Sequence, residues 1–347
     1  MSGGVDSSAA AALLLDKGYE VEGATMQIWP DVTDEEERIT RGCCSQSAVD
    51  DARRVAMHLG IKYHVFNFKD IFEKSVISPF VCEYLRGRTP NPCIECNKIV
   101  KFEAFLNRAL TLGFDYIATG HYGSVIDNNG IYELHSSKAA KKDQSYFLYN
   151  FTQHTLKHTL MPLGGYCKEQ VREIAKELEI PVANKPDSQE ICFVCDDDYA
   201  GFICDYADYE PVSGDMLDVN GNVIGTHKGL IHYTIGQRKG IGAFGRPMFV
   251  MSLDAQNNAI TLGEKGMEFS KELTAADMNY ISGNPITEAT RLKAKIRYQA
   301  EAADVTVYPG VNNTARIVFN TPQRAVTPGQ AVVLYDGDNV VGGGTVM

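Results

Sequence analysis

The sequence predicts an α/β protein with a first domain built on a parallel sheet, a small mixed central domain and a C-terminal β-barrel. Three observations support this: a length of 347 residues, alternating helix and strand patterns in the first part, and short strands between turn residues in the last part. A chain of this length is too long to fold around one ordinary hydrophobic core, so two or three domains are expected. The pattern changes place the domains at 1–205, 206–270 and 271–347.

The first domain alternates helices with strands. Helices are expected at 7–18, 45–60 and 97–113, and strands at 21–28, 62–68 and 115–122. Ser45 is expected to cap its helix, and Gly18 and Gly60 are expected to end theirs. This alternation is typical of a parallel sheet covered by helices, whose ligand site lies beyond the carboxyl ends of the strands.

The rest of the chain is rich in short alternating stretches. Residues 218–225 read DVNGNVIG, which has the Asn-Gly pattern of a tight hairpin. Further strands are expected at 292–298, 303–309, 314–320 and 331–337. Several short strands separated by turns predict a small β-barrel.

Charge and composition narrow the class of function. A net charge of −11 argues against a surface coated with basic residues. Three segments nevertheless carry basic residues and no acid, namely 138–142, 223–247 and 291–297. Such runs are often only solvated surface, but three together favour local phosphate contacts. No apolar run approaches the roughly 20 residues of a membrane span and no signal peptide is evident, so a cytoplasmic protein without a membrane partner is expected.

A phosphate-binding loop is predicted directly before the first helix. It reads Ser2-Gly3-Gly4-Val5-Asp6-Ser7-Ser8. Glycines let a backbone approach a polyphosphate closely, and the N–H groups and dipole of the following helix bind an anion. Asp6 among phosphate ligands indicates a ligand or water-holder for Mg²⁺, and the absence of a Walker lysine argues against ordinary γ-phosphoryl transfer. A simple Gly-Gly turn with a serine cap is the plain alternative.

Cysteines supply the second candidate site. With no secretory signal, nine cysteines indicate thiol or metal chemistry rather than a disulfide framework. Cys93 and Cys96 form a C-x-x-C pair before an expected helix, and Cys192 and Cys195 form another in a later loop. A thiolate is stabilised near a helix N-terminus. Sulfur transfer needs one thiol that carries a persulfide and a second that releases the sulfur.

The loop at 2–8 resembles that of the PP-loop ATP pyrophosphatases. This resemblance implies an adenine nucleotide alpha hydrolase-like fold, ATP binding, and activation of a carbonyl oxygen by adenylation with release of pyrophosphate. Members of that superfamily act on different substrates, so the loop alone leaves the substrate open.

Motifs along the whole chain are similar to the tRNA-specific 2-thiouridylase family (MnmA, TrmU). The matching pieces are SGGVDSS, IATGHY, KKDQSYFLY, RTPNPxxxCNKxxKF, DSxxICF, TIGQRKGIG, Arg297-Tyr298 and TPGQAVVLY. The resemblance implies ATP-dependent 2-thiolation of uridine 34 in the tRNA anticodon, with a persulfide donor protein as partner. An unstacked base in an RNA loop is accessible to such chemistry.

The resemblance also implies a role for individual residues. ATP would be held by the loop 2–8 together with Met26 and Gly120. Cys192 would carry the persulfide, and Cys96 would be the nucleophile that frees its sulfur. Residues bordering the flipped base would be Asn91, Pro92 and Cys93. Residues contacting tRNA would be His121, Lys142, Asp143, Gln144, Arg297, Tyr298 and Gln330.

Several alternatives stay open at this point. Many relatives carry an acid where this chain has Cys93, so Cys93, Cys96 and Cys192 are possible ligands of an iron–sulfur cluster (4Fe–4S) in a cluster-dependent thiolase. A zinc site made by both C-x-x-C pairs is less favoured, because paired zinc ligands usually lie about 15 to 20 residues apart. The remaining cysteines are interpreted as buried small hydrophobic residues: Cys43, Cys44, Cys82, Cys167 and Cys204.

Two other functions are also compatible with the motifs, and the start of the chain differs from that of relatives. A different PP-loop ligase would not need Cys96 and Cys192, and a catalytically idle RNA-binding protein would need no ATP. Relatives carry an apolar strand before the phosphate loop, whereas Met1 directly precedes Ser2 here. A parallel sheet lacking a central strand is expected to be unstable or filled by a substitute.

Overall fold

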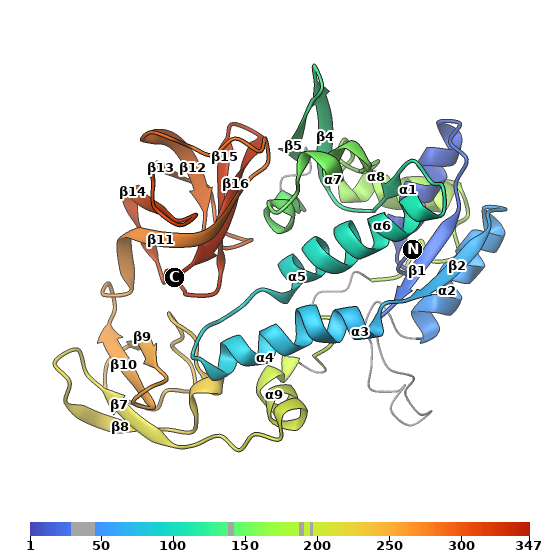
Figure 1. Cartoon of the computed structure of the whole chain (residues 1–347). Helices are drawn as coiled ribbons and strands as arrows, with labels where there is room; N and C mark the ends of the chain where they lie inside the picture. Colours follow the sequence, from blue (N-terminus) through green and yellow to red (C-terminus); the bar gives the residue numbers. More distant parts are fainter. Residues whose placement is uncertain (29–45, 138–141, 187–190, 195–196) are drawn as a thin grey trace.

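The computed structural model describes residues 1–28, 46–137, 142–186, 191–194 and 197–347. Figure 1 shows the first part of the chain at the right, the central strands at the lower left and the C-terminal barrel at the upper left. Some predictions fall outside the described residues: the Ser45 cap, most of the basic segment 138–142, and Cys43, Cys44 and Cys195. Within the described residues, no helix is both long and apolar enough to cross a bilayer.

The first part alternates helices with short parallel strands, as predicted. Its helices are α1 Val5–Asp16, α2 Gln46–His58, α3 Lys69–Phe72, α4 Ser78–Leu85, α5 Pro92–Glu95, α6 Phe105–Thr111, α7 Gln153–Lys157, α8 Lys168–Glu177 and α9 Tyr199–Ala207. Its strands are β1 Gly23–Gln27, β2 Tyr63–Asn67, β3 Ile117–Ala118, β4 Gly123–Asn128, β5 Ile131–Ser136 and β6 Thr159–Leu160. Strand β1 pairs with β2 and β3 pairs with β6, both in parallel. Of the strand expected at 115–122, only two residues join a ladder.

Two long helices lie side by side beyond the parallel strands (Figure 1). The first consists of α3, the π-helical turn η1 Glu73–Ile77 and α4, and the second of α5, the π-helical stretch η2 Cys96–Ala104 and α6. The second helix begins at Pro92, five residues before the predicted start at 97, because proline has the helical φ and needs no N–H at the first position of a helix. Cys93 and Cys96 therefore lie inside the first turns of the helix and not before it.

The short strands predicted for the second half are present in the central part and in the C-terminal barrel. The central strands are β7 Gly214–Leu217, β8 Val223–His227, β9 Met248–Asp254 and β10 Ala259–Glu264, and the short 3-10 turn η5 is Leu230–His232. The barrel strands are β11 Phe269–Tyr280, β12 Thr290–Lys295, β13 Ala303–Pro309, β14 Ala315–Arg324, β15 Ala331–Asp336 and β16 Asn339–Val346. Their order is β11-β14-β13-β12-β15-β16, and pairing of β11 with β16 closes the barrel. The hairpin predicted at 218–225 joins β7 to β8.

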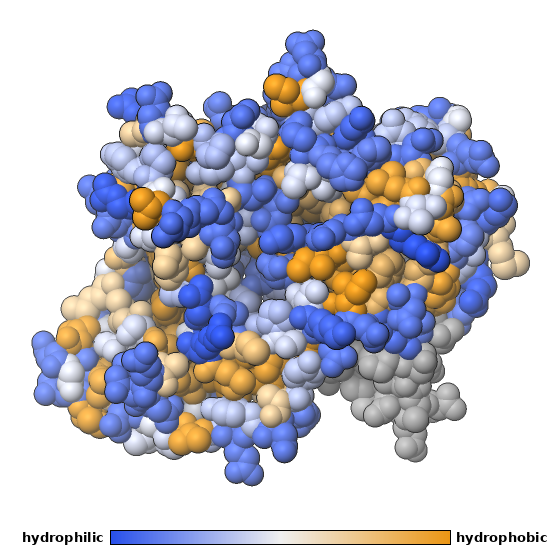
Figure 2. Space-filling model, in the orientation of Figure 1, coloured by the Kyte–Doolittle hydropathy of each residue, from blue (hydrophilic) through white to orange (hydrophobic). Residues whose placement is uncertain are grey.

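Shared hydrophobic clusters join the parts. One cluster contains Leu106 of the second long helix, Tyr146 of the 3-10 turn η3 Ser145–Leu148, and Val333 of the barrel. The β4–β5 hairpin extends the barrel sheet, since His135 pairs with Asn339 of β16. Figure 2 shows hydrophobic residues in the seam between the two long helices and a hollow between these helices and the barrel. The barrel is therefore packed onto the first part and is not tethered only by a linker.

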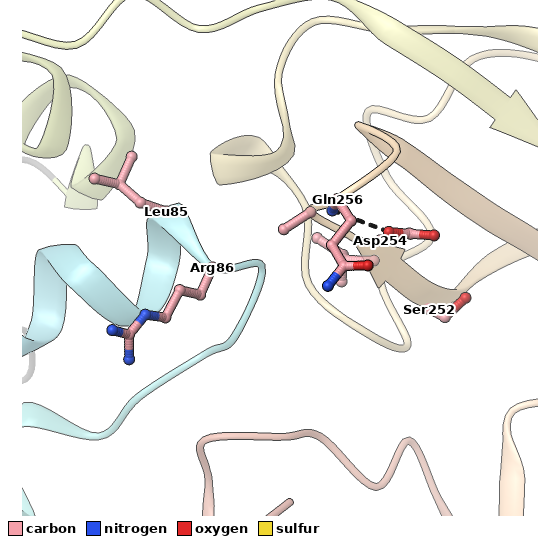
Figure 3. Close-up of a pocket in the computed structure, with 7 residues that line it drawn as sticks. Leu85, Arg86, Ser252, Asp254 and Gln256 are labelled. Carbon is pink, nitrogen blue, oxygen red and sulfur yellow. Dashed lines mark hydrogen bonds between the residues drawn. The ribbon is translucent and has the colours of Figure 1, made fainter.

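A groove of about 660 Å³ separates the end of α4 from the β9–β10 turn. Figure 3 shows Leu85 and Arg86 on one side and Ser252, Asp254 and Gln256 on the other. The Asp254 carboxylate accepts a hydrogen bond from the Gln256 N–H, which shapes the turn itself. No residue predicted for ATP, sulfur or tRNA lines this groove, so the candidate site lies elsewhere.

Candidate functional site

The predicted phosphate loop wraps the N-terminus of α1. Gly4 is the N-cap and has no side chain to cap the first turn, so backbone N–H groups there stay suited to an anion. The Ser7 and Ser8 hydroxyls donate to the Gly4 carbonyl at 3.2 and 2.9 Å, and the Ser2 N–H donates to Ser7 Oγ at 3.1 Å. Gly3 has φ +66°, and a Cβ there would lie 2.4 Å from the Ala48 carbonyl oxygen. The loop is thus tightly folded against α2, which a plain turn does not require.

Asp6 lies in the first turn of α1 and is already paired within the protein. The Nζ of Lys168, the first residue of α8, donates to its two carboxylate oxygens at 2.7 and 2.8 Å. The Tyr122 hydroxyl donates to Oδ1 at 2.8 Å. Because an ammonium holds both oxygens, the predicted coordination of Mg²⁺ by Asp6 does not fit this arrangement. Neither Lys168 nor Tyr122 is among the residues predicted from the sequence.

Gly120 lies directly against the phosphate loop. A Cβ on Gly120 would lie 2.7 Å from the carbonyl carbon of Asp6 and 2.8 Å from the backbone nitrogen of Ser7. Met26, the other residue predicted near the nucleotide, is half-buried on β1 opposite Phe66 of β2. Both residues follow parallel strands or lie near their ends, where the ligand site of such a sheet is expected.

A second lysine supports the loop from the side of α2. The Nζ of Lys185 donates to the Gly3 carbonyl at 3.1 Å and to Asp51 Oδ2 at 2.6 Å. Arg172 on α8 in turn donates to the Lys185 carbonyl at 3.4 Å. This chain of contacts connects the phosphate loop to the segment that leads towards Cys192, and it was not anticipated from the sequence.

The two predicted sulfur-handling cysteines border one hydrophobic cluster. Cys96, at the start of η2, and Cys192 are both half-buried and pack against a cluster that includes Phe80 and Phe193. Met26 packs against the same cluster. The fold thus brings residues distant in sequence, predicted for sulfur and for ATP, to one hydrophobic core.

The possible cluster ligands are not gathered into a metal site. Cys93 is exposed on α5, whereas Cys96 and Cys192 are half-buried. Across the described parts of the chain, no group of three or more His, Cys, Asp or Glu side chains is close enough to hold a metal ion. The ligand set of Cys93, Cys96 and Cys192 therefore does not fit a cluster in this arrangement.

Burial of the other cysteines differs from the prediction. Cys82 is exposed, because the buried face of α4 carries Phe80, Val81 and Tyr84 and leaves Cys82 outside. Cys167 and Cys204 are only half-buried. The interpretation as a buried small hydrophobic residue is therefore wrong for Cys82, whereas Cys204 packs against the hydrophobic cluster of Phe80 and Phe193.

A short strap of residues 88–91 leads into the cysteine helix and is held by the barrel. The Gln330 amide donates to the Thr89 and Pro90 carbonyls at 2.8 and 3.4 Å, and the Thr89 N–H donates to the Pro328 carbonyl at 3.0 Å. Asn91 and Pro92 line a cavity of about 360 Å³ between the strap and the barrel. Gln330 was predicted as a tRNA contact, and in this structure it bonds to the strap.

Other predicted tRNA contacts also make internal contacts. Asp143 is buried and accepts from the Ser137 and Ser145 N–H groups at 3.0 and 3.2 Å. Gln144 accepts from the Tyr122 N–H at 3.0 Å. Burial and the Lys101 ammonium lower the pKa of His121 well below its ordinary value, so its ring is neutral at neutral pH.

The remaining predicted contacts gather near the barrel rim. Arg297 donates to the Ala325 carbonyl, and Tyr298 packs on Phe147 with ring centroids 4.5 Å apart. Lys142 is half-buried. Burial raises the pKa of Tyr298, and the nearby Lys142 ammonium opposes this by lowering it.

The acid-free segments are less uniformly basic in space than in sequence. Lys293 pairs with Asp304 at 2.9 Å, and Arg246 pairs with Glu264 at 2.7 Å. Lys228, Arg238 and Lys239 are exposed. Both segments are therefore partly neutralised by acids, and exposed basic residues remain in the central part.

Comparisons with known proteins cover the whole chain. Three family models match: a tRNA methyl transferase HUP domain over residues 1–196, a tRNA methyl transferase PRC-barrel domain over 200–264 and an aminomethyltransferase beta-barrel domain over 270–346. The chain is 60% identical over 349 aligned positions to the tRNA-specific 2-thiouridylase MnmA of Acetivibrio thermocellus, covering 100% of this chain and 97% of that protein. It is 52% identical to the protein of the same name from Clostridioides difficile, with 100% and 96% covered.

Identity above one half along nearly the full length of both proteins goes far beyond a shared loop. The chain belongs to the tRNA-specific 2-thiouridylase family.

Proposed function

We propose that this protein is an ATP-dependent sulfurtransferase that converts uridine 34 of tRNA to 2-thiouridine. The observation that carries the proposal is the common location of Cys96, Cys192 and Met26 at one hydrophobic cluster, in a chain whose phosphate loop opens α1. The names of the full-length relatives support the substrate. The protein has a catalytic domain at 1–205, a tRNA-contacting domain at 206–270 and a barrel domain at 271–347. It acts in the cytoplasm.

The chemistry starts with the poor electrophilicity of the uracil C2 carbonyl. Its oxygen attacks the α-phosphate of ATP, pyrophosphate leaves, and an adenylate becomes the leaving group at C2. Backbone N–H groups at the start of α1, with Ser2, Ser7 and Ser8, hold the phosphates. Met26 and Gly120 border the nucleotide.

Sulfur follows a two-thiol route. A donor protein leaves a persulfide on Cys192, and the Cys96 thiolate attacks Cys192 Sγ to release hydrosulfide, which displaces AMP from C2. A disulfide between Cys96 and Cys192 results, and a dithiol reductant returns it to two thiols. Asn91, Pro92 and Cys93 border the flipped base, and the exposed basic residues of the central domain contact tRNA phosphates.

Reconstitution with purified components tests the proposal. The protein is combined with an unmodified tRNA transcript, ATP, Mg²⁺, a dithiol reductant, cysteine and a cysteine desulfurase, and nucleosides are analysed by mass spectrometry. We expect 2-thiouridine at position 34, with AMP and pyrophosphate formed in equal amounts. Cys82→Ser, which alters an exposed thiol on α4, is the control and should retain full activity.

The same reconstitution discriminates the alternatives. With S-adenosylmethionine added to the mixture, a methylated uridine formed without 2-thiouridine would contradict the proposal. A coloured protein, purified anaerobically, whose activity disappears in Cys93→Ala would favour the cluster-dependent thiolase instead. ATP consumption with a substrate other than tRNA would indicate another PP-loop ligase.

Gln330 offers a test of how the barrel contributes. Gln330→Leu removes the bonds to the Thr89 and Pro90 carbonyls and loosens the strap before the cysteine helix, while the backbone bond from Thr89 to Pro328 remains. We expect the rate of thiolation at saturating tRNA to fall about tenfold, equivalent to about 1.4 kcal/mol, while the Kd for tRNA is unchanged. Gln323→Leu is the matched control, because the amide of the half-buried Gln323 donates to the Thr321 carbonyl of its own strand β14 and not to the strap. A weaker Kd with an unchanged saturated rate would instead make Gln330 a tRNA contact.

A further inference from the structure

Three elements meet at the carboxylate of Asp6. Asp6 lies in the first turn of α1, Lys168 is the first residue of α8, and Tyr122 precedes β4. The three hydrogen bonds are all between 2.7 and 2.8 Å. Lys168 and Tyr122 are buried, with 8% and 2% of their surface exposed, whereas the Asp6 side chain is 32% exposed. The partners that hold the carboxylate are thus inside the protein, whereas the Asp6 side chain itself is partly exposed.

The position of Lys168 is unfavourable without Asp6. The positive end of the helix dipole disfavours a cation at the start of α8, and burial of an ammonium is costly unless it is paired and hydrogen-bonded. Asp6 supplies both requirements. Conversely, an unpaired carboxylate in a loop that receives phosphates would repel them. Each residue therefore removes a cost that the other would create.

On the basis of the ATP chemistry proposed above, we infer that Lys168 is the internal counter-cation of the phosphate loop and, with Tyr122, a positioning residue for it. Asp6 is then a structural anion of the loop whose charge the protein itself compensates, and it is not a ligand of Mg²⁺. Lys168 and Tyr122 fix the first turn of α1, so that its N–H groups are set for the phosphates before nucleotide arrives.

A double-mutant cycle tests this role. In Lys168→Met the Asp6 carboxylate is left unpaired beside the phosphates, so we expect the KM for ATP and the Kd for ATP to rise about tenfold, with little change in the Kd for tRNA. Asp6→Asn removes the carboxylate charge that Lys168 Nζ holds. In the double variant Asp6→Asn with Lys168→Met both charges are gone, and ATP affinity should recover to within about threefold of wild type. Lys176→Met, in the exposed last turn of α8, is the matched control.

Magnesium dependence separates the two roles of Asp6. We expect the Mg²⁺ concentration for half-maximal rate to be the same, within about twofold, in wild type and Asp6→Asn. A tenfold higher Mg²⁺ requirement in Asp6→Asn, or a double variant that binds ATP more weakly than Lys168→Met, would overturn the inference and make Asp6 a metal ligand.

Tyr122→Phe provides a second test if Lys168→Met does not fold. It keeps the ring and loses one hydrogen bond, and it should weaken ATP binding about threefold.

Direct ATP binding keeps this inference distinct from the proposed function. Equilibrium dialysis measures the Kd for ATP of wild type and of each variant in the double-mutant cycle, without tRNA or sulfur. If wild type binds ATP and the cycle behaves as expected, yet no 2-thiouridine forms, the proposed function fails and the role of Lys168 stands. If 2-thiouridine forms but the cycle shows no coupling between Asp6 and Lys168, the role inferred for Lys168 is wrong and the proposed function stands.

Discussion

Cys192→Ser is expected to abolish formation of 2-thiouridine while tRNA and ATP binding persist. A serine hydroxyl cannot carry a persulfide sulfur, so the reaction loses its sulfur carrier and not merely an accelerating group; the rate should fall by at least about 10³-fold. The half-buried Cys192 lies beside Phe193 in a hydrophobic cluster, and a serine there preserves the side-chain volume. Mass spectrometry of tRNA nucleosides and a tRNA binding titration measure the two quantities.

Cys96→Ser should arrest the same pathway one step later. The persulfide still forms on Cys192 but is not released, so the intact protein should accumulate the mass of one additional sulfur atom after incubation with the donor. Cys82→Ser is again the control. A Cys192→Ser variant that still produces 2-thiouridine would show that another thiol is the sulfur carrier.

Gly120→Ala is expected to lower ATP affinity by about 10- to 100-fold. The added Cβ would lie 2.7 and 2.8 Å from backbone atoms of Asp6 and Ser7, and backbone at a helix start cannot rotate away as a flexible side chain does. Overpacking of this kind costs about 1 to 3 kcal/mol, and here the strain falls on the phosphate loop itself. The Kd for ATP and the thiolation rate measure the effect.

Gly165→Ala provides a matched control for that substitution. Gly165 is exposed, and a Cβ there meets no atom within 4 Å. It should leave ATP affinity and activity unchanged. Equal losses in both variants would mean that Gly120→Ala acts through general destabilisation, and thermal unfolding of the two proteins would reveal this.

Local patterns predicted the elements whose signals lie within a few residues. The alanine- and leucine-rich helix after the phosphate loop and the alternating barrel strands are of this kind, and so is the Asn220-Gly221 hairpin. The early start of the second long helix was missed although Pro92 is a start signal, because the C-x-x-C pair was placed before the helix. The exposure of Cys82 depends on which face of α4 is buried, and only the packing decides that.

The partners of Asp6 illustrate what local patterns cannot reveal. Lys168 is separated from Asp6 by 162 residues and Tyr122 by 116. One clue existed in the sequence: a lysine at the start of an amphipathic helix opposes the helix dipole, which indicates a nearby acid without identifying it. The pairing of the basic segments with acids such as Asp304 and Glu264 likewise joins residues of different segments and is not visible in either segment alone.

The contact between the strap and the barrel has a consequence for the order in which the working protein is made. Gln330 closes on Thr89 across 241 residues of chain, and Arg88 donates to the Val346 carbonyl across 258. During synthesis the cysteine helix and phosphate loop emerge long before the strands that secure the strap, and such distant contacts form late in folding. A ribosome must therefore deliver almost the whole chain before the cysteine helix has its final support, so incomplete translation products carry the reactive thiols without the framework that directs them.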